Sequence, residues 1–395
     1  ASTPIINMLI GFFMGISTGA GVVIAQFFGA GDLSKMKKAI HNSIALTLVI
    51  GVVLTVIGLV FNDPILKAIG VPNDVFSEAS TYLSIYFWSL IFVMIYNMGS
   101  GILRSVGDSK RPLYFLIFSS IINIVLDFLF VKNFGFGVAG AGYATLIAQA
   151  ISAIMVMYVL MKTEDSYKVV LKDIKFDKEI LLKIIKIGLP TGFQQSIVSL
   201  SNVIVQSYIN VYGASVIAGY SVTIKIDGFV NLPLQAFNMA ITTFVGQNIG
   251  AKQYNRVKKG AYITTFLAMV TIGFFVVIMY FFGRDFIALF NQEKDVIDAG
   301  RLMQLTFLPF YIFLPINQVI NGVLRGAGRS AVPMYVMIFS FVFLRQIYLF
   351  LVTKVTSDVV YVFLGWPTTW VVCSLIFIVY FFKVQWLPQE KGAEA

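Results

Sequence analysis

The chain has 395 residues, of which 58% are hydrophobic and 12% carry a formal charge, and its mean hydropathy is +0.85. Because soluble domains carry about 25% charged residues, this composition excludes a water-soluble globular protein and indicates an all-α polytopic membrane protein. A single Cys and a single His exclude a disulfide framework and a thiolate zinc site, and the net charge of +10 fits loops that orient a membrane protein rather than nucleic acid binding.

Eleven apolar runs are long enough to cross a bilayer as helices, which takes about 20 residues each. In chain order they are 4–28, 40–61, 79–103, 112–131, 137–161, 180–210, 216–248, 257–282, 299–323, 332–352 and 360–383. In the first run, Gly11, Gly15 and Gly19 follow one another at four-residue spacing, which predicts close packing against another helix.

Basic residues predict the orientation of these runs. The loops on one side of the predicted membrane hold 21 Lys and Arg residues, counted with the C-terminal tail and the helix turns next to these loops. The loops on the other side hold six. Because positive charge concentrates on the cytoplasmic side, we expect the C-terminus in the cytoplasm and the start of the given chain outside. We therefore expect a multi-pass protein of the cell membrane.

Two motifs recur at one spacing. The segment 23–30 (VIAQFFGA) returns as 244–251 (FVGQNIGA), and 101–107 (GILRSVG) returns as 322–328 (GVLRGAG), both 221 residues later. The chain is therefore an internal duplication of two six-helix repeats in parallel orientation.

The offset also predicts the domains. A second unit that begins near Lys175 has 221 residues and the first has 174, so we expect about 47 residues, with one more helix, before the given start. The expected domains are an N-terminal lobe of five helices at 1–162, a cytoplasmic linker at 163–179 and a C-terminal lobe of six helices at 180–395.

Charged residues in the middle of a span are costly and are functional candidates. Asp127 lies one helical turn after Asn123, on the same face, and Thr145 on the next helix is expected at a similar depth. Oxygen atoms of these three residues suit a proton or a small cation such as Na⁺; the alternative is a polar cluster that only joins two helices. By the 221-residue offset, the second repeat has Leu344 and Tyr348 in place of Asn123 and Asp127.

Other polar residues lie in the second half. Lys225 and Asp227 point to different helix faces, and Arg345 could neutralise Asp227; substrate translocation and structural charge compensation are both open. Amides could line a cavity for amphipathic compounds or join helices by hydrogen bonds; they are Gln194, Gln195, Asn202, Gln206, Asn231, Gln235, Asn238, Asn317, Gln318 and Asn321.

These motifs together resemble the multidrug and toxic compound extrusion family of transporters. The resemblance covers the whole chain and includes Gly188-Leu189-Pro190 at the start of the second half. It implies two lobes around a central cavity and efflux of organic, often cationic, compounds against a proton or Na⁺ gradient. It also implies a cation site at Asn123, Asp127 and Thr145. The family's usual Asp on the first helix would lie in the missing segment.

We therefore expect a secondary antiporter that works by alternating access, as a monomer in the lipid bilayer with small organic substrates. It needs no enzymatic activity and no cofactor beyond H⁺ or Na⁺. Alternatives are a related flippase of lipid-linked saccharides, a membrane enzyme, or a shortened form without transport activity. The flippase would need a strongly cationic cavity, and only Lys225 and Arg345 lie within spans.

Overall fold

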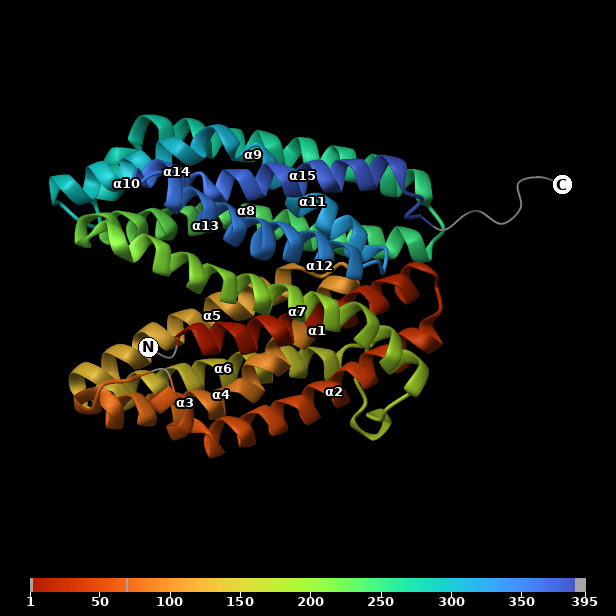
Figure 1. Cartoon of the computed structure of the whole chain (residues 1–395). Coiled ribbons are helices and arrows are strands. Elements are labelled where there is room, and N and C mark those ends of the chain that lie inside the picture. The colour runs from red at the N-terminus through yellow and green to blue at the C-terminus, as the bar shows by residue number, and fades with distance from the viewer. Residues whose placement is uncertain (1–2, 69, 388–395) are drawn as a thin grey trace. The chain divides into compact units, whose positions relative to one another are not determined.

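A computed structural model describes residues 3–68 and 70–387, with side chains from Ile10 onward (Figure 1). Every regular element in these ranges is a helix, which confirms the all-α fold class. The tail with Lys391, which was counted among the basic residues, lies outside the described residues. The chain divides into two compact units, Ala1–Gly192 and Phe193–Ala395.

The first unit is built from long helices with short connections. In chain order these are α1 (Thr3–Gly29), α2 (Leu33–Val60), α3 (Asn62–Ala68), α4 (Asn73–Ser105), α5 (Lys110–Asp127), the π-helical segment η1 (Phe128–Asn133), α6 (Gly137–Lys162), the 3-10 helix η2 (Leu171–Asp173) and the first half of α7 (Lys178–Ile209). Apolar side chains of α1, α2, α4, α6 and α7 form its buried core.

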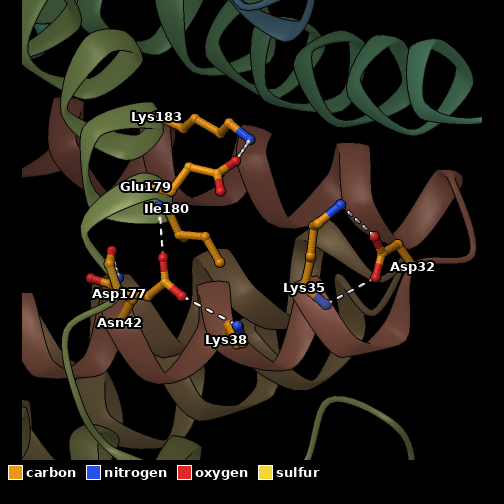
Figure 2. Close-up of polar contacts among 8 residues, drawn as sticks. All are labelled: Asp32, Lys35, Lys38, Asn42, Asp177, Glu179, Ile180 and Lys183. Carbon is orange, nitrogen blue, oxygen red and sulfur yellow. Dashed lines mark hydrogen bonds and ion pairs between the residues drawn. The ribbon is translucent and has the colours of Figure 1, made fainter.

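Polar residues at the turns fix where these helices begin. Asp32 accepts a hydrogen bond from the backbone N–H of Lys35 at 3.0 Å, which satisfies one free donor in the first turn of α2. This bond, together with the side chain of Lys35 at 3.2 Å, holds the pKa of the Asp32 carboxyl below its ordinary value. Figure 2 shows both contacts.

Glycines let α1 and the first half of α7 pack backbone to backbone, as the four-residue spacing predicts. A Cβ added at Gly15 would lie 2.2 Å from the backbone N of Gly192, and one at Gly19 would lie 2.5 Å from the backbone N of Gly188. This packing places the boundary between the units inside α7, whereas the sequence suggests it in the linker 163–179.

The second unit begins with the rest of α7 and continues through a similar set of helices. These are η3 (Asn210–Tyr212), α8 (Ala214–Gly250), α9 (Tyr254–Ala288), α10 (Lys294–Phe307), η4 (Leu308–Phe310), α11 (Phe313–Gly326), α12 (Ala331–Ile338), the π-helical segment η5 (Phe339–Leu344), α13 (Arg345–Val355), α14 (Val359–Phe363) and α15 (Gly365–Lys383). Helices α10 and α11 meet at a 59° bend around η4, where Pro309 and Pro315 interrupt the run.

The described helices agree with the eleven predicted spans. By length and composition, eight of the described helices could cross a membrane, and the bent pair α10–α11 makes up to nine. The runs 180–210 and 216–248 form α7 and α8, helices of 32 and 37 residues. The many amide side chains of α7 and α8 lower the mean hydropathy of these two helices.

Candidate functional site

Two polar side chains on α5 carry buried atoms that have no hydrogen-bond partner. Asn123 and Asp127 are both half-buried and lie one turn apart. The Nδ2 atom of Asn123 and the Oδ1 atom of Asp127 are both buried and both unpartnered. A buried polar atom without a partner costs about 1–3 kcal/mol. A ligand that bonds to these two atoms would remove that cost.

Thr145 lies on α6, which packs against α5. Its side chain is half-buried, and its hydroxyl donates to the carbonyl of Ala141 on its own helix at 3.0 Å. Within the described residues, no hydrogen bond joins Thr145 to Asn123 or Asp127. The predicted trio therefore lies on two packed helices, but its members are not bonded to one another.

A widened helical turn begins directly after Asp127. At the end of η1 the backbone N–H of Phe134 donates to the carbonyl of Leu129, five residues earlier, at 2.9 Å. Such π-helical turns are rare and often occur at functional sites. The turn that follows is tight because Gly135 and Gly137 have positive φ angles of 68° and 54°.

The carboxyl group of Asp127 has no counter-charge in the structure. Asp127 takes part in none of the ion pairs described for residues 10–68 and 70–387. An amide can turn either its oxygen or its nitrogen toward a neighbour. Asn123 and Asp127 can therefore offer oxygen atoms to a cation, or an amide N–H to the carboxylate.

Asp227 and Lys225 lie on opposite sides of α8, as their spacing predicts. Asp227 is buried at 8% exposure and accepts a hydrogen bond from the hydroxyl of Tyr311. Lys225 is exposed, with its Nζ 5.9 Å from the ring centre of Phe290. Tyr311 in turn stacks on Trp370 with ring centroids 5.6 Å apart.

Arg345 does not neutralise Asp227, so this part of the charge-compensation hypothesis is wrong. Its guanidinium is buried at 1% exposure and donates to Asn202 Oδ1 at 2.8 Å and to Thr369 Oγ1 at 3.3 Å. The guanidinium carbon also lies 4.9 Å from the ring centre of Phe341. Asp227 and Arg345 therefore both bond to neutral residues of the second unit rather than to each other.

The amides of the second unit divide by burial. Gln194 and Asn317 are buried and join helices: Gln194 accepts from Arg325 at 3.2 Å, and Asn317 donates to the carbonyl of Trp370 at 3.1 Å. Asn231 is half-buried and donates to the backbone carbonyl of Asp227 at 2.9 Å. The side chains of Gln195, Asn202 and Gln235 are exposed and remain candidates for a substrate-facing surface.

Sequence reasoning missed two residues of this polar interior. Arg325 was counted as a loop charge, yet it is buried at 5% exposure and reaches Asn238 Oδ1 at 3.4 Å as well as Gln194. Its place in the repeated Gly-x-Leu-Arg motif was the available signal. Tyr311 was not expected to be the partner of Asp227; it lies at the bend between α10 and α11, and its hydroxyl donates to Asp227.

Comparisons with known proteins agree with this architecture. The chain matches the family described as MatE over residues 1–129 and 190–351. It is 30% identical, over 98% of this chain and 85% of the relative, to "Probable multidrug resistance protein YoeA" of Bacillus subtilis. It is 24% identical, over 85% of this chain and 74% of the relative, to "Multidrug export protein MepA" of Staphylococcus aureus.

Solved structures share the fold. One, from Pyrococcus furiosus, is described as "Reverse polarity of binding pocket suggests different function of a MOP superfamily transporter"; it superposes with a TM-score of 0.91 at 23% identity, covering 96% of this chain and 85% of that one. Another is described as the outward-facing conformation of a multidrug resistance MATE family transporter, with a TM-score of 0.89 at 23% identity over the same shares.

Proposed function

Because the chain belongs to the MatE family of membrane transporters, we propose that it exports organic, drug-like compounds by proton- or sodium-coupled antiport. Relatives that carry multidrug resistance or export names, at 30% and 24% identity over most of the chain, support the substrate class. The observation that carries the coupling proposal is the pair of unpartnered buried atoms on Asn123 and Asp127.

A carboxyl group in this position needs an external partner. The Oδ1 atom of Asp127 is buried without a hydrogen-bond partner, which costs free energy, and no described ion pair supplies this carboxylate with a cation. Binding of a proton or a small cation to Asp127 removes this free-energy cost, and the cost returns when the ion dissociates. Asp127 is therefore the group that registers the coupling ion, and Asn123 and Thr145 are the neighbours that complete its oxygen shell.

The position of the acid in one repeat only supports a dedicated role. The second repeat carries Leu344 and Tyr348 at the positions that the 221-residue offset gives, and it has no acidic residue anywhere from Phe339 to Ser357, so a shift of register by η5 does not supply one. The fold therefore does not require an acid at this point. An acid that merely stabilised the repeat would be expected in both halves.

The coupling ion acts through a shift between conformations. A ligand moves an equilibrium between two states only by its difference in affinity for them. We propose that the ion binds Asp127 more tightly in one access state of the transporter and that substrate favours the other. Ion and substrate then alternate, and the ion gradient drives export.

The test uses the chain reconstituted in vesicles with ethidium as a cationic probe. We expect the wild type to move ethidium against an imposed proton or Na⁺ gradient, and Asp127→Asn to lose gradient-driven movement at least about tenfold. Asp227→Asn is the matched control, because this acid is also buried but already has a partner in Tyr311. Both variants should elute from a sizing column as folded protein.

The outcomes separate the alternatives. Full gradient-driven efflux by Asp127→Asn would overturn the coupling assignment. If efflux stops only when the proton gradient is collapsed, the coupling ion is H⁺. If it stops only when the Na⁺ gradient is collapsed, the coupling ion is Na⁺. A flippase of lipid-linked saccharides would instead leave ethidium unmoved and translocate a labelled lipid pyrophosphate.

A further inference from the structure

The linker between α6 and α7 is fastened to α2 by the only histidine of the chain. His41 is buried at 5% exposure. Its Nε2 atom accepts a hydrogen bond from the backbone N–H of Val170 at 2.9 Å. Its Nδ1 atom lies 2.7 Å from the carbonyl oxygen of Lys37. One side chain thus bridges residues 129 positions apart in the sequence.

The two partners fix the protonation state of the ring. The carbonyl oxygen of Lys37 can only accept a hydrogen bond, so Nδ1 must carry the hydrogen. The N–H of Val170 can only donate, so Nε2 must present a lone pair. Both contacts exist together only in the neutral imidazole with its hydrogen on Nδ1.

Further contacts hold the end of the linker, and these do not change near neutral pH (Figure 2). Asn42 donates to the backbone carbonyl of Asp177 at 2.7 Å, and Lys38 pairs with the Asp177 carboxylate at 3.4 Å. The backbone N–H of Ile180 bonds to that carboxylate and holds its pKa below the ordinary value. Asp177 therefore stays charged as the medium is acidified toward pH 5, whereas histidine ordinarily changes charge between about pH 5 and 8.

Within the part of the chain that the structure describes, no carboxylate is placed to form an ion pair with a protonated His41. The described residues contain no ion pair to its ring, and the nearby carboxylates of Asp177 and Glu179 are already paired with Lys38 and Lys183. The other charged groups on the linker and on the adjoining ends of α2, α4 and α6 are the basic residues Lys35, Lys37, Arg104, Lys162, Lys168, Lys172 and Lys175 and the acids Glu164, Asp165 and Asp173. No described ion pair joins any of these acids to the ring, and Asp165 already accepts from the Thr163 hydroxyl at 3.0 Å. The ring would have to carry its charge without a partner.

We propose that protonation of His41 releases the linker from α2, so that the segment acts as a pH-sensitive latch. A protonated Nε2 would point its hydrogen at the hydrogen of Val170 N–H. One hydrogen bond is lost and an unpaired charge is left buried, and both effects favour the open linker. Opening frees the Val170 N–H and the chain that follows it, while Val169 still donates to the carbonyl of Leu160 at 2.8 Å and Asn42 and Lys38 still hold the far end of the linker. The latch is independent of the export activity proposed above.

The test measures hydrogen exchange by mass spectrometry on the full chain in lipid nanodiscs, at about pH 7.5 and about pH 5.5. Exchange rates are divided by the intrinsic rates of the unstructured peptide at each pH. We expect peptides that report the Val170 amide to lose about tenfold of that amide's protection at the lower pH, while peptides from the middle of α2 keep theirs. Transport plays no part in this readout.

Two substitutions of the same residue make the matched pair. In His41→Gln, the side-chain oxygen can accept the Val170 N–H at every pH, so the linker should stay protected at both. In His41→Asn, the amide is too short to reach Val170, so the linker should exchange fast at both. Asn42→Ala weakens the other fastening and should raise exchange at both pH values without removing the pH response.

Two results would overturn the latch. One is a wild-type linker whose corrected protection is the same at both pH values. The other is a His41→Gln linker that loses protection on acidification as the wild type does. The wild-type measurement decides by itself if the variants do not fold.

Discussion

Substitution of Gly19 by Ala tests the backbone-to-backbone contact between α1 and the first half of α7. The added Cβ would lie 2.5 Å from the backbone N of Gly188, whereas ordinary contact begins at 3.4 Å. The two helices must therefore separate by about 1 Å at this point, because a backbone atom cannot rotate away as a side-chain tip can. Overpacking of this kind costs about 1–3 kcal/mol.

The assay is thermal unfolding of the detergent-solubilised protein, followed by the folded fraction on a sizing column. With about 2–4 °C lost per kcal/mol for a unit of this size, Gly19→Ala should unfold about 2–12 °C below the wild type. Gly19→Val should fall further. Gly273→Ala in α9 is the control, because nothing lies within 4 Å of its added Cβ, and the gain in helix propensity makes it neutral or slightly stabilising.

Equal unfolding temperatures for Gly19→Ala and Gly273→Ala would refute the close contact between α1 and α7. That result would mean that α1 and α7 are not in contact at the described distance, or that they separate at no cost.

Three further predictions concern the polar groups. Tyr311→Phe should destabilise the protein by about 1–3 kcal/mol because it leaves Asp227 without its donor; in a double-mutant cycle with Asp227→Asn, strict additivity would disprove the contact. Arg345→Lys should lower the melting temperature at least as much as Arg345→Met, because it keeps a buried charge and loses the planar fork; a harmless Lys would contradict this. The depressed pKa of Asp177 stabilises the start of α7 above the ordinary carboxyl range, and that stability is lost as pH falls through the folded pKa; Asp177→Asn should therefore reduce protection of that turn against exchange at pH 7, and the difference from the wild type should shrink as the pH falls below the ordinary carboxyl range, whereas equal protection at pH 7 would contradict this.

Much of the architecture followed from local pattern. Apolar runs of about 20 residues can only be helices in a bilayer, because each backbone N–H and C=O must be satisfied within its own segment. The four-residue spacing of Gly15 and Gly19 predicted a close approach, and the structure supplies Gly188 and Gly192 as the partners.

The partners of buried charges were beyond local pattern. Arg345 and Asp227 are the obvious opposite charges in the second half, but pairing depends on which helix faces meet, and this is a property of the packed bundle. Tyr311 reaches Asp227 only because prolines bend the chain between α10 and α11. Arg325 looked like a loop residue, since a sequence does not show that neighbouring helices cover the end of α11.

The two π-helical segments have a consequence for the duplication itself. A π-helical turn adds one residue and rotates everything after it by about 100° relative to a regular helix. In the first unit the extra residue falls at 128–133, after Asp127, whereas in the second it falls at 339–344, ahead of Arg345. Residues aligned by the 221-residue offset consequently face different ways: Ile124 is 69% exposed, and its counterpart Arg345 is 1% exposed. The π-helical turn lies at different points in the two repeats, so between these points a residue aligned by the 221-residue offset is rotated by about 100° around its helix relative to its counterpart.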